Sequence, residues 1–329
     1  MPVNLRGRSF LTLQDFTGEE IRYLLDLSHD LKAKKRAGIR NKLLEGKNIV
    51  LLFKKTSTRT RCAFEVAALD EGAHVTFLDQ ASSQMNKKES LEDTARVLGR
   101  YYDGIEYRGY EQSVVESLAK FSGVPVFNGL TDVDHPTQIL ADLMTMEEHL
   151  DKPLKKCKVV YVGDTRNNVS LAWTIAAAKL GFEYIGLGPK ELLPDSMLIA
   201  QRNEEAAVLG GSVRFTDNVD DVSEADVVYT DVWVSMGDED KLEKHVALLT
   251  PYRLDQRMFK QLACSDGIFM HCLPSFHDLE TTFAKKVNEL GLNVCEVTDE
   301  VFRSPYSVVF DEAENRLHTI KAVLVAMLV

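Results

Sequence analysis

The side chains most suited to chemistry cluster in residues 54–61, which read Lys-Lys-Thr-Ser-Thr-Arg-Thr-Arg and carry four basic groups but no acidic one. The segment follows an apolar run and opens an expected helix. A helix N-terminus already presents free N–H groups and about half a positive charge, so Arg59 and Arg61 are unfavourable there unless an anion neutralises them. Arginine forks fit tetrahedral oxyanions, and hydroxyls add further donors. The hydroxyl donors of this segment are Ser57, Thr58 and Thr60. The segment therefore predicts a phosphate site; the alternative is a Ser/Thr helix cap with solvated charges.

A second polar segment, His-Pro-Thr-Gln at residues 135–138, has a proline suited to the first turn of a helix. His135 precedes that turn and Gln138 lies in it. A neutral imidazole and a carboxamide could both donate to a carbonyl oxygen. Taken alone, the motif is equally compatible with a structural histidine cap.

Two further segments follow apolar strands in the second half of the chain. Residues 231–237 place a carboxylate, a hydroxyl and a glycine at a sheet edge, and residues 271–274 read His-Cys-Leu-Pro. Open α/β sheets bind ligands at the carboxyl ends of their strands. Asp231 would suit an ammonium group. Cys272 could be a nucleophile, a metal ligand, a polar pocket wall or an inert buried cysteine, and because no recognised zinc spacing is present we expect no metal.

Residues 163–168, Gly-Asp-Thr-Arg-Asn-Asn, also follow a strand and open a helix, as a dinucleotide fingerprint would. The second and third glycines of that fingerprint are missing, so the backbone could not approach a pyrophosphate closely. We therefore expect no nicotinamide cofactor, and no cofactor of another kind is indicated.

The elements that must position these segments form an α/β pattern, in which short apolar runs alternate with amphipathic stretches. The pattern predicts two doubly wound parallel-sheet domains. Expected strands are residues 48–53, 74–78, 104–107, 124–127, 158–162, 184–187, 213–216, 227–230 and 268–270. Expected helices are residues 60–71, 90–102, 137–150, 169–180, 195–209, 255–262 and 315–329.

A proline at position 153 ends the long apolar helix 137–150, so we place the domain boundary there, giving domains 1–150 and 151–329. The last helix, about residues 315–329, carries one apolar stripe and could pack back on the first domain.

Composition excludes several classes of protein. With 329 residues, 45% hydrophobic and 27% charged, the chain should bury substantial cores. A formal net charge of -11 repels nucleic acid and anionic lipid, so an anionic ligand must be captured by local charge. Five cysteines without a C-x-x-C pair indicate no disulfide framework and fit a reducing cytoplasm. No apolar run is long enough for a membrane span, so we expect a cytoplasmic protein.

Taken together and in this order, four motifs resemble the aspartate/ornithine carbamoyltransferase family: residues 57–61, 135–138, 231–237 and 271–274. The first two are typical of the wider family and the last two of its ornithine branch. The resemblance runs through nearly the whole chain, with further matches at residues 88–90, 93–100, 107–109 and 314–316.

The resemblance implies transfer of the carbamoyl group of carbamoyl phosphate to the δ-amine of L-ornithine, giving L-citrulline and phosphate, in arginine biosynthesis or the arginine deiminase pathway. It implies that residues 1–150 bind carbamoyl phosphate and residues 151–329 bind ornithine. It also implies a homotrimer, or a multiple of trimers, whose active sites lie between subunits.

Matched positions imply the site residues. Those for carbamoyl phosphate are Ser57, Thr58, Arg59, Thr60, Gln84, Arg108, His135, Gln138, Cys272, Leu273 and Arg316. Those for ornithine are Asn168, Asp231, Ser235 and Met236. The residues implied to be catalytic are Arg108, His135, Gln138, Asp231 and Cys272. The chain departs from many relatives after Gln84 and Met85, where it has Asn86 and Lys87 in the loop expected to reach a neighbouring subunit.

Two alternatives stay open at this point. One is a carbamoyltransferase for another amine: aspartate is disfavoured because an acidic co-substrate would want basic residues in place of Asp231, and putrescine because the loop at residues 235–237 differs. The other is a non-catalytic homologue that binds metabolites or a partner protein.

Overall fold

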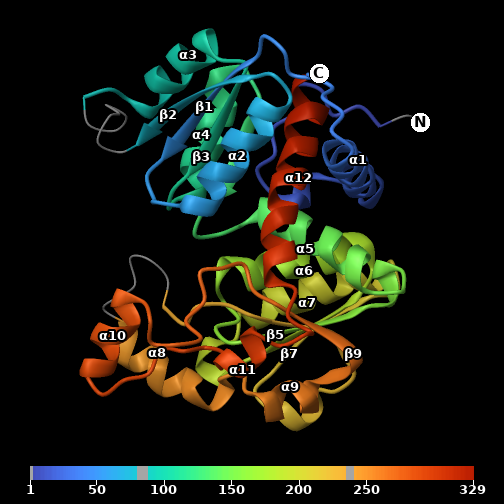
Figure 1. Ribbon diagram of the computed structural model, residues 1–329, viewed down its shortest axis with the longest axis vertical. Coiled ribbons are helices and arrows are strands. Elements are labelled where there is room, and N and C mark those ends of the chain that lie inside the picture. Colours follow the sequence, from blue (N-terminus) through green and yellow to red (C-terminus); the bar gives the residue numbers. More distant parts are fainter. Residues whose placement is uncertain (1–2, 80–87, 235–240) are drawn as a thin grey trace. The chain divides into compact units, whose positions relative to one another are not determined.

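The chain folds into two compact units, drawn in Figure 1. The computed structural model describes residues 3–79, 88–234 and 241–329. Unit 1 comprises Met1–Met144 together with Ala313–Val329, and unit 2 comprises Thr145–Glu312. The chain passes between the units twice, once inside α5 (Pro136–His149) and once inside α12 (Val309–Leu328). The first of these divisions falls after Met144, a few residues before the boundary after residue 150 that Pro153 indicated. Most of the terminal helix belongs to unit 1.

Unit 1 is built on a parallel sheet with the strand order β2-β1-β3-β4. The strands are β1 (Asn48–Phe53), β2 (His74–Asp79), β3 (Gly104–Arg108) and β4 (Val126–Leu130). The crossover helices are α2 (Thr58–Asp70), α3 (Leu91–Tyr101) and α4 (Gln112–Ser122). From β1 the chain moves outward to β2 and then returns to the other side of β1, so the topology switches direction between β1 and β3.

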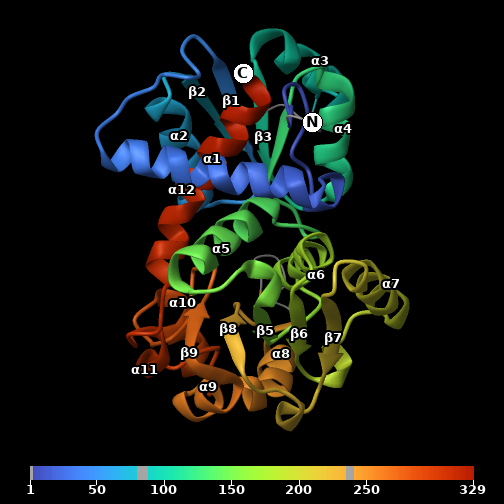
Figure 2. The same cartoon turned by 90° about the vertical axis from the view of Figure 1, so that its right-hand side faces the viewer.

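Alternation along the strands gives the two faces of this sheet different partners. Ile105 and Tyr107 of β3 pack with α3 and α4 in one apolar cluster. The opposite face is covered by α2 and α12, where Phe64 of α2 lies 6.4 Å, ring to ring, from Phe127 of β4. In Figure 2, α3 and α4 lie on one side of these strands and α2 and α12 on the other. Glu106 and Arg108, which alternate with these apolar residues along β3, lie on the face that α2 and α12 cover.

Helix α1 (Gly18–Arg36), to which no sequence pattern was assigned, begins with a capping box at Thr17 and helps to anchor α12. Lys32 of α1 donates to Asn315 Oδ1 at 2.7 Å. Lys321 of α12 is only 2% exposed, and its Nζ lies 2.8 Å from Asp70 Oδ2 at the end of α2. These contacts hold α12 against the first two helices of unit 1.

Unit 2 is built on a second parallel sheet, with the order β7-β6-β5-β8-β9. Its strands are β5 (Lys158–Val162), β6 (Glu183–Leu187), β7 (Ser212–Thr216), β8 (Ala225–Thr230) and β9 (Ala263–Met270). Its helices are α6 (Asn168–Leu180), α7 (Ser196–Ala207), α8 (Leu242–Leu249), α9 (Gln256–Leu262), α10 (Thr282–Glu289) and α11 (Asp299–Phe302).

Both faces of this sheet are buried, as expected for parallel strands. On one face, Val160 and Phe269 belong to an apolar cluster with Phe259 of α9 and Val301 of α11. On the other face, Trp173 of α6 meets Tyr229 of β8 edge-on at 5.8 Å, and α7 packs beside α6. The topology here switches between β5 and β8.

These sheets confirm the predicted α/β class with two doubly wound domains. Most strand bounds agree with the sequence pattern within one or two residues. The last strand, predicted at residues 268–270, begins five residues earlier, at Ala263. The fourth strand is displaced from residues 124–127 to Val126–Leu130. Pro125 has no N–H to donate, so the ladder begins after it, and it continues over Asn128 and Gly129, whose types argued against a strand. In the part of the chain described here, no helix is long and apolar enough to cross a membrane.

The ion pair that anchors α12 can be tested by comparing two lysines that share one carboxylate. Lys321→Met leaves Asp70 without its buried partner and should lower the free energy of unfolding by about 3 kcal/mol. Lys35→Met removes a contact of 2.5 Å to the same Asp70, but this lysine side chain is 37% exposed, so its loss should cost less than about 1 kcal/mol. Urea unfolding of both variants measures the difference; equal costs would contradict an anchoring role for Lys321.

Candidate functional site

The polar segments of unit 1 meet at the switch point of its sheet. Phe53, the last residue of β1, lies opposite Arg108, the last residue of β3. Residues 54–61 therefore start beside Arg108, and the Lys54 N–H donates to the Arg108 carbonyl at 2.8 Å. The carboxyl ends of strands at such a switch point are where open α/β sheets bind ligands.

The hydroxyl of Thr60 is the centre of this site. Ser57 caps α2 by accepting from the Thr60 backbone N–H at 3.2 Å, so Thr58, Arg59 and Thr60 form the first turn of the helix. Thr60 is 1% exposed, and its Oγ1 accepts from Arg108 Nη1 and from Arg316 Nη2, both at 3.1 Å. One hydroxyl thus positions two guanidinium groups that come from β3 and from α12.

Arg316 connects this helix terminus to the start of α5. Its Nη1 donates to Gln138 Oε1 at 2.7 Å, and its Nη2 donates to Thr137 Oγ1 at 3.3 Å. Gln138 donates in turn to Asp142 Oδ1 at 2.8 Å. The structure therefore brings together five sequence-predicted residues, which we call the basic cluster. Its members are Thr60, Arg108, His135, Gln138 and Arg316.

His135 is buried and uncharged in this cluster. Burial lowers the pKa of His135 well below 6.5, and the positive charges of Arg316, Arg108 and Arg59 lower the pKa further. Its Nε2 lies 3.4 Å from Arg316 Nη1, which can only donate, and its Nδ1 lies 3.4 Å from Thr137 Oγ1. This geometry favours the tautomer with the proton on Nδ1.

Arg61 and Lys55, in the 54–61 segment, have countercharges within the protein. Arg61 lies 3.6 Å from Glu65 and stacks over the ring of Phe77 at 3.7 Å. Lys55 pairs with Asp132 at 2.5 Å. The argument that an anion must neutralise all of this charge was therefore wrong for Arg61, because the i,i+4 acid on the same helix supplies its countercharge.

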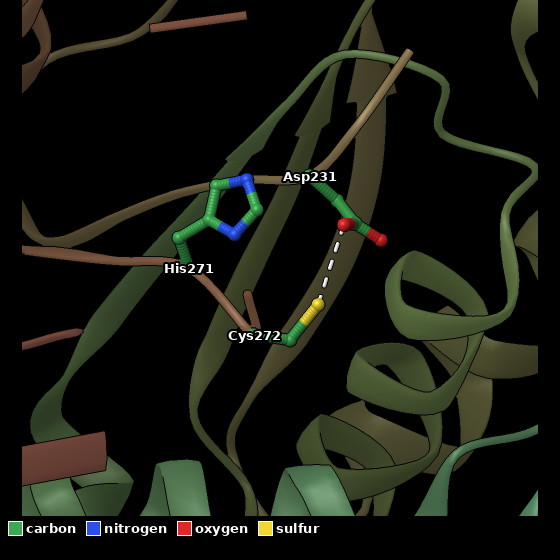
Figure 3. Close-up of side chains that lie close together, drawn as sticks. All are labelled: Asp231, His271 and Cys272. Carbon is green, nitrogen blue, oxygen red and sulfur yellow. Dashed lines mark hydrogen bonds between the residues drawn. The ribbon is translucent and has the colours of Figure 1, made fainter. Parts of the chain in front are cut away.

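In unit 2 the second group of polar residues also lies at strand ends. Asp231 follows β8 and Cys272 follows β9 by two residues. Figure 3 shows the Cys272 thiol directed at the Asp231 carboxylate, to which it donates with an Sγ to Oδ1 distance of 3.2 Å. Asn167, which follows β5, donates to the other oxygen of Asp231 at 3.1 Å. The carboxylate thus lies where strands β5, β8 and β9 end.

The environment of Asp231 has a consequence for Cys272. Burial raises the pKa of Asp231, although the Val232 N–H and the Cys272 thiol, which donate to it, favour its charged form. A thiol whose proton is held by a carboxylate is disfavoured as a thiolate, which is the nucleophilic form of cysteine. The geometry therefore supports an orienting or wall-forming role for Cys272 over a nucleophilic one.

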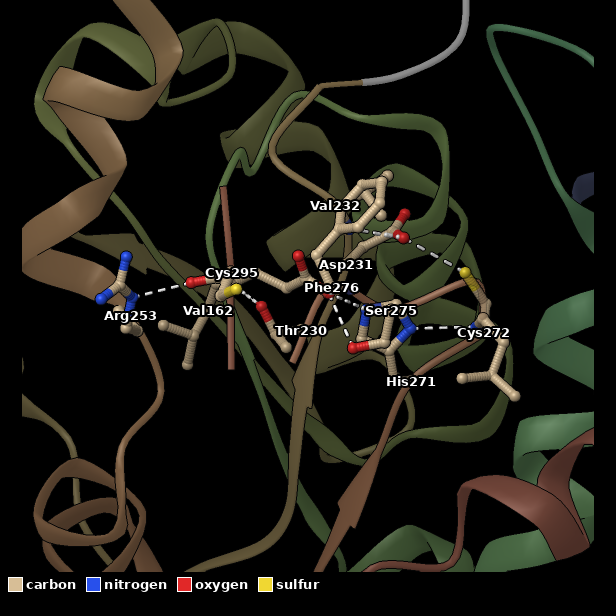
Figure 4. A network of polar contacts seen from close by, with 12 residues as sticks. Val162, Thr230, Asp231, Val232, Arg253, His271, Cys272, Ser275, Phe276 and Cys295 are labelled. Carbon is tan, nitrogen blue, oxygen red and sulfur yellow. Dashed lines mark hydrogen bonds and ion pairs between the residues drawn. The ribbon is translucent and has the colours of Figure 1, made fainter. Parts of the chain in front are cut away.

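The loop that carries Cys272 is organised by Glu296, which the sequence analysis missed. Glu296 is fully buried, and its Oε1 accepts from Ser275 Oγ and the Phe276 N–H, both at 2.7 Å. The Leu273 N–H donates to His271 Nδ1 at 2.9 Å, so the ring proton must be on Nε2, which donates to Glu296 at 3.1 Å. Figure 4 labels four residues of this loop: His271, Cys272, Ser275 and Phe276. The sequence does contain a signal for Glu296, because it is the one charged residue in the otherwise apolar stretch 294–297.

Asn167 is a second residue that the sequence analysis missed, because the resemblance assigned the neighbouring Asn168. Asn167 caps α6 by accepting from the Ser170 N–H at 2.8 Å, and its amide group reaches Asp231 and the hydroxyl of Tyr161. Asn168 is the first residue of α6. Leu273 is partly buried against the unit 2 core.

Three predicted site residues lie outside the described residues: Gln84, Ser235 and Met236. The departure at Asn86 and Lys87 also lies there.

Among the residues that the structure describes, two groups of side chains have ligand atoms close enough together to surround a cation. The first is Asp231, His271 and Cys272, and the second is His277, Asp278 and Asp299. In the first group, both ring nitrogens of His271 are engaged in the hydrogen bonds described above. In the second group, the Arg303 guanidinium lies 2.7 Å from Asp299 and 3.8 Å from Asp278. Existing partners therefore occupy the ligand atoms of both groups.

The fold and these sites define a class of α/β protein with two doubly wound units, one holding a buried basic cluster and the other a buried carboxylate at its switch point. The family model described as "Aspartate/ornithine carbamoyltransferase, carbamoyl-P binding domain" matches residues 8–148. The model described as "Aspartate/ornithine carbamoyltransferase, Asp/Orn binding domain" matches residues 155–327. The chain belongs to the aspartate/ornithine carbamoyltransferase family.

Similar proteins cover the whole chain. A protein described as "Ornithine carbamoyltransferase, catabolic" from Clostridium perfringens (strain 13 / Type A) is 62% identical over 329 residues, 99% of both chains. One with the same description from Treponema denticola is 59% identical over 326 residues, 98% of this chain and 96% of that protein. The solved structure of ornithine carbamoyltransferase from Pyrococcus furiosus superposes with a TM-score of 0.90 at 43% identity, covering 99% of both chains.

The uncharged state of His135 can be measured by NMR of histidine ring nitrogens, with the resonance identified by its loss in His135→Asn. We expect no titration of this ring between about pH 6 and 8, because its pKa lies well below the value of about 6.5 for an exposed histidine. The folded state binds this proton more weakly than the unfolded chain, so the stability from neutral His135 is present above about pH 6.5 and is lost as the pH falls. A midpoint near 6.5 would contradict the assigned environment.

Proposed function

We propose that this protein transfers the carbamoyl group of carbamoyl phosphate to the δ-amine of L-ornithine, giving L-citrulline and phosphate. The observation that carries the proposal is the pair of buried guanidinium groups held by Thr60 beside the N-terminus of α2. This arrangement suits a small phosphorylated substrate with a carbonyl group. Relatives of 62% and 59% identity described as ornithine carbamoyltransferases support the choice of ornithine as acceptor.

Unit 1 binds carbamoyl phosphate in this proposal. The phosphate lies at the start of α2, where the helix N–H groups, Ser57, Thr58, Arg59 and Thr60 donate to its oxygens. Arg108 bridges the phosphate and the carbamoyl group. Gln138, Arg316 and His135 of unit 1 complete the site. The family resemblance also implies Gln84, Cys272 and Leu273 as carbamoyl-phosphate-binding residues.

The reaction begins with polarisation of the carbonyl group. Donors aimed at the developing oxyanion typically contribute a factor of about 10² to 10³ each to the rate. Arg108 is one such donor, and the Thr58 hydroxyl is another. His135, which is neutral, donates from Nε2 only after its 3.4 Å contact with Arg316 opens and the ring proton moves from Nδ1.

Unit 2 binds ornithine through Asp231, Asn168, Ser235 and Met236. The Asp231 carboxylate attracts the ammonium form of the side chain, whose pKa in a lysine-like amine is about 10.4. Attack requires the free base, so the ammonium group must lose one proton to solvent before the carbon–nitrogen bond forms. The Cys272 thiol and the Asn167 amide hold Asp231 in place for this step.

The attack forms a tetrahedral intermediate without a covalent enzyme adduct. The nitrogen lone pair bonds to the carbonyl carbon, and the carbon–oxygen bond to phosphate then breaks with its electron pair going to the phosphate oxygen. The phosphate accepts the proton that the attacking nitrogen loses. No step needs a metal or an organic cofactor.

We also propose a homotrimer in the cytoplasm, acting in the catabolic direction. The catabolic direction rests on the descriptions of the relatives at 62% and 59% identity. The cytoplasmic assignment is supported by the five cysteines, all of which are free thiols. The trimer is what the family resemblance implies. The molar mass of the protein in solution, measured by light scattering, would be three times the 37.0 kDa of one chain.

A turnover assay with four amines tests the proposed acceptor. With carbamoyl phosphate in excess, we expect L-ornithine to give citrulline with a kcat/KM at least about 10³-fold above those for putrescine, L-aspartate and N-acetyl-L-ornithine. Putrescine lacks the α-carboxylate, N-acetyl-L-ornithine has its α-amine blocked and L-aspartate lacks the δ-amine, and a site that binds these groups rejects analogues without them. Comparable use of putrescine would overturn the choice of ornithine. Absence of product with every amine would favour a non-catalytic homologue.

Two neighbouring arginines provide a matched test of the phosphate site. Arg59→Ala should weaken carbamoyl phosphate binding by about 10²-fold, since a hydrogen bond between charged groups contributes about 1.5–3 kcal/mol. Arg61→Ala should leave the affinity within about twofold, because Arg61 pairs with Glu65 and Phe77. Calorimetric titration measures both. Equal affinities for the two variants would contradict the phosphate assignment.

A further inference from the structure

Glu106 is a buried carboxyl group beside the basic cluster that the proposed mechanism does not use. It lies in the middle of β3, fully buried, and neither of its oxygens has a hydrogen-bond partner among the residues that the structure describes. Strand alternation places it on the same face as Arg108, two residues later. A buried carboxyl group without a hydrogen bond is costly, so its presence here requires an explanation.

The backbone of β4 is shaped to admit this side chain. The register of the β3–β4 pair shifts between Tyr107 and Arg108, which leaves Gly129 as an extra residue in β4. A Cβ atom at Gly129 would lie 2.0 Å from Glu106 Oε1 and 3.1 Å from Thr60 Cγ2. The carboxyl group therefore occupies the space that a side chain at 129 would need, next to the threonine that holds both guanidinium groups.

The charges around Glu106 act in opposite directions. Burial raises the pKa of Glu106 well above its usual range, while the guanidinium groups of Arg108 on β3 and Arg316 on α12 favour the ionised form. Tyr107, its neighbour in β3, has a raised pKa and is uncharged near neutral pH, as is His135. The two arginines are therefore the charges that oppose the effect of burial on the pKa of Glu106, and they are also the groups that would bind an anion.

We propose that Glu106 is a proton-linked counter-ion of the anion site: it takes up one proton from solvent when a phosphate dianion binds the basic cluster, and releases it when the anion leaves. This inference rests on the proposed function of the cluster. A bound dianion cancels the positive charge that stabilises the carboxylate, so the carboxylate is protonated. When the anion has left, the ionised carboxylate again compensates the guanidinium charges and disfavours rebinding of product phosphate. Glu106 thus acts on the anion through its charge, which opposes those of Arg108 and Arg316.

The linkage predicts a specific pH dependence. Proton uptake by Glu106 is largest between its pKa in the free protein and its higher pKa in the anion-bound protein. Within that window, anion affinity should rise as the pH falls, by up to about tenfold per pH unit. A residue with only a structural role would change the affinity without changing the number of protons taken up.

The test is calorimetric titration of the full chain with inorganic phosphate from about pH 6 to 9, in two buffers that differ in ionisation enthalpy. The wild type should take up as much as one proton more per bound phosphate than Glu106→Gln at some pH within this range. The protonation of phosphate itself is common to both proteins. Glu116→Gln, an exposed residue of α4, serves as the control and should match the wild type.

Equal proton uptake by wild type and Glu106→Gln across the whole range would overturn the inference, as would failure of the wild type to bind phosphate. If Glu106→Gln does not fold, infrared difference spectra of the wild type decide: phosphate should replace a carboxylate band with the band of a protonated carboxylic acid, and an unchanged carboxyl region would contradict the proposal. The ornithine assay is separate, so a protein that shows the uptake but makes no citrulline would refute the proposed function alone.

Discussion

The structure of unit 1 depends on bringing two guanidinium groups into the protein interior at one hydroxyl. Arg108 and Arg316 come from positions far apart in the sequence, and both donate to Thr60. Like charges at such short range repel, so the arrangement requires acceptors held in place. The N-terminus of α2 supplies Thr60, and the start of α5 supplies Thr137 and Gln138. Arg316 reaches them from α12, which is why a terminal helix anchored by buried lysines belongs to this unit.

Unit 2 handles the opposite charge with the same architecture. Its buried carboxylate, Asp231, sits at the strand ends and is held by an amide and a thiol that donate to it. One oxygen of Glu296 stabilises the loop that contains Cys272, because it accepts hydrogen bonds from His271, Ser275 and Phe276. These two buried acids of unit 2 thus have different roles: Asp231 provides a negative charge at the strand ends, and Glu296 holds the loop after β9 in place.

Much of the fold and of the candidate site was predictable because the signals were local. Alternating apolar runs indicated both sheets, and the hydroxyls, arginines and prolines at 57–61 and 135–138 marked the helix starts that carry the basic cluster. Contacts across the sequence were not predictable. Arg61 could not be distinguished from Arg59, because both follow the same helix cap; only the side-chain directions show that Arg61 turns to Glu65 and Phe77.

The sequence by itself determined the α/β class, the family motifs and the residues at the strand ends, because periodicity and helix-capping chemistry act over a few neighbouring residues. Tertiary structure decided which of those residues meet. It brought Asn167 within hydrogen-bond distance of Asp231. It placed Glu296 where it accepts hydrogen bonds from Ser275 and Phe276. It also placed Glu106 beside Thr60, where a bulge at Gly129 leaves room for its side chain. These outcomes depend on strand order, register and side-chain direction, which arise only when distant segments pack together.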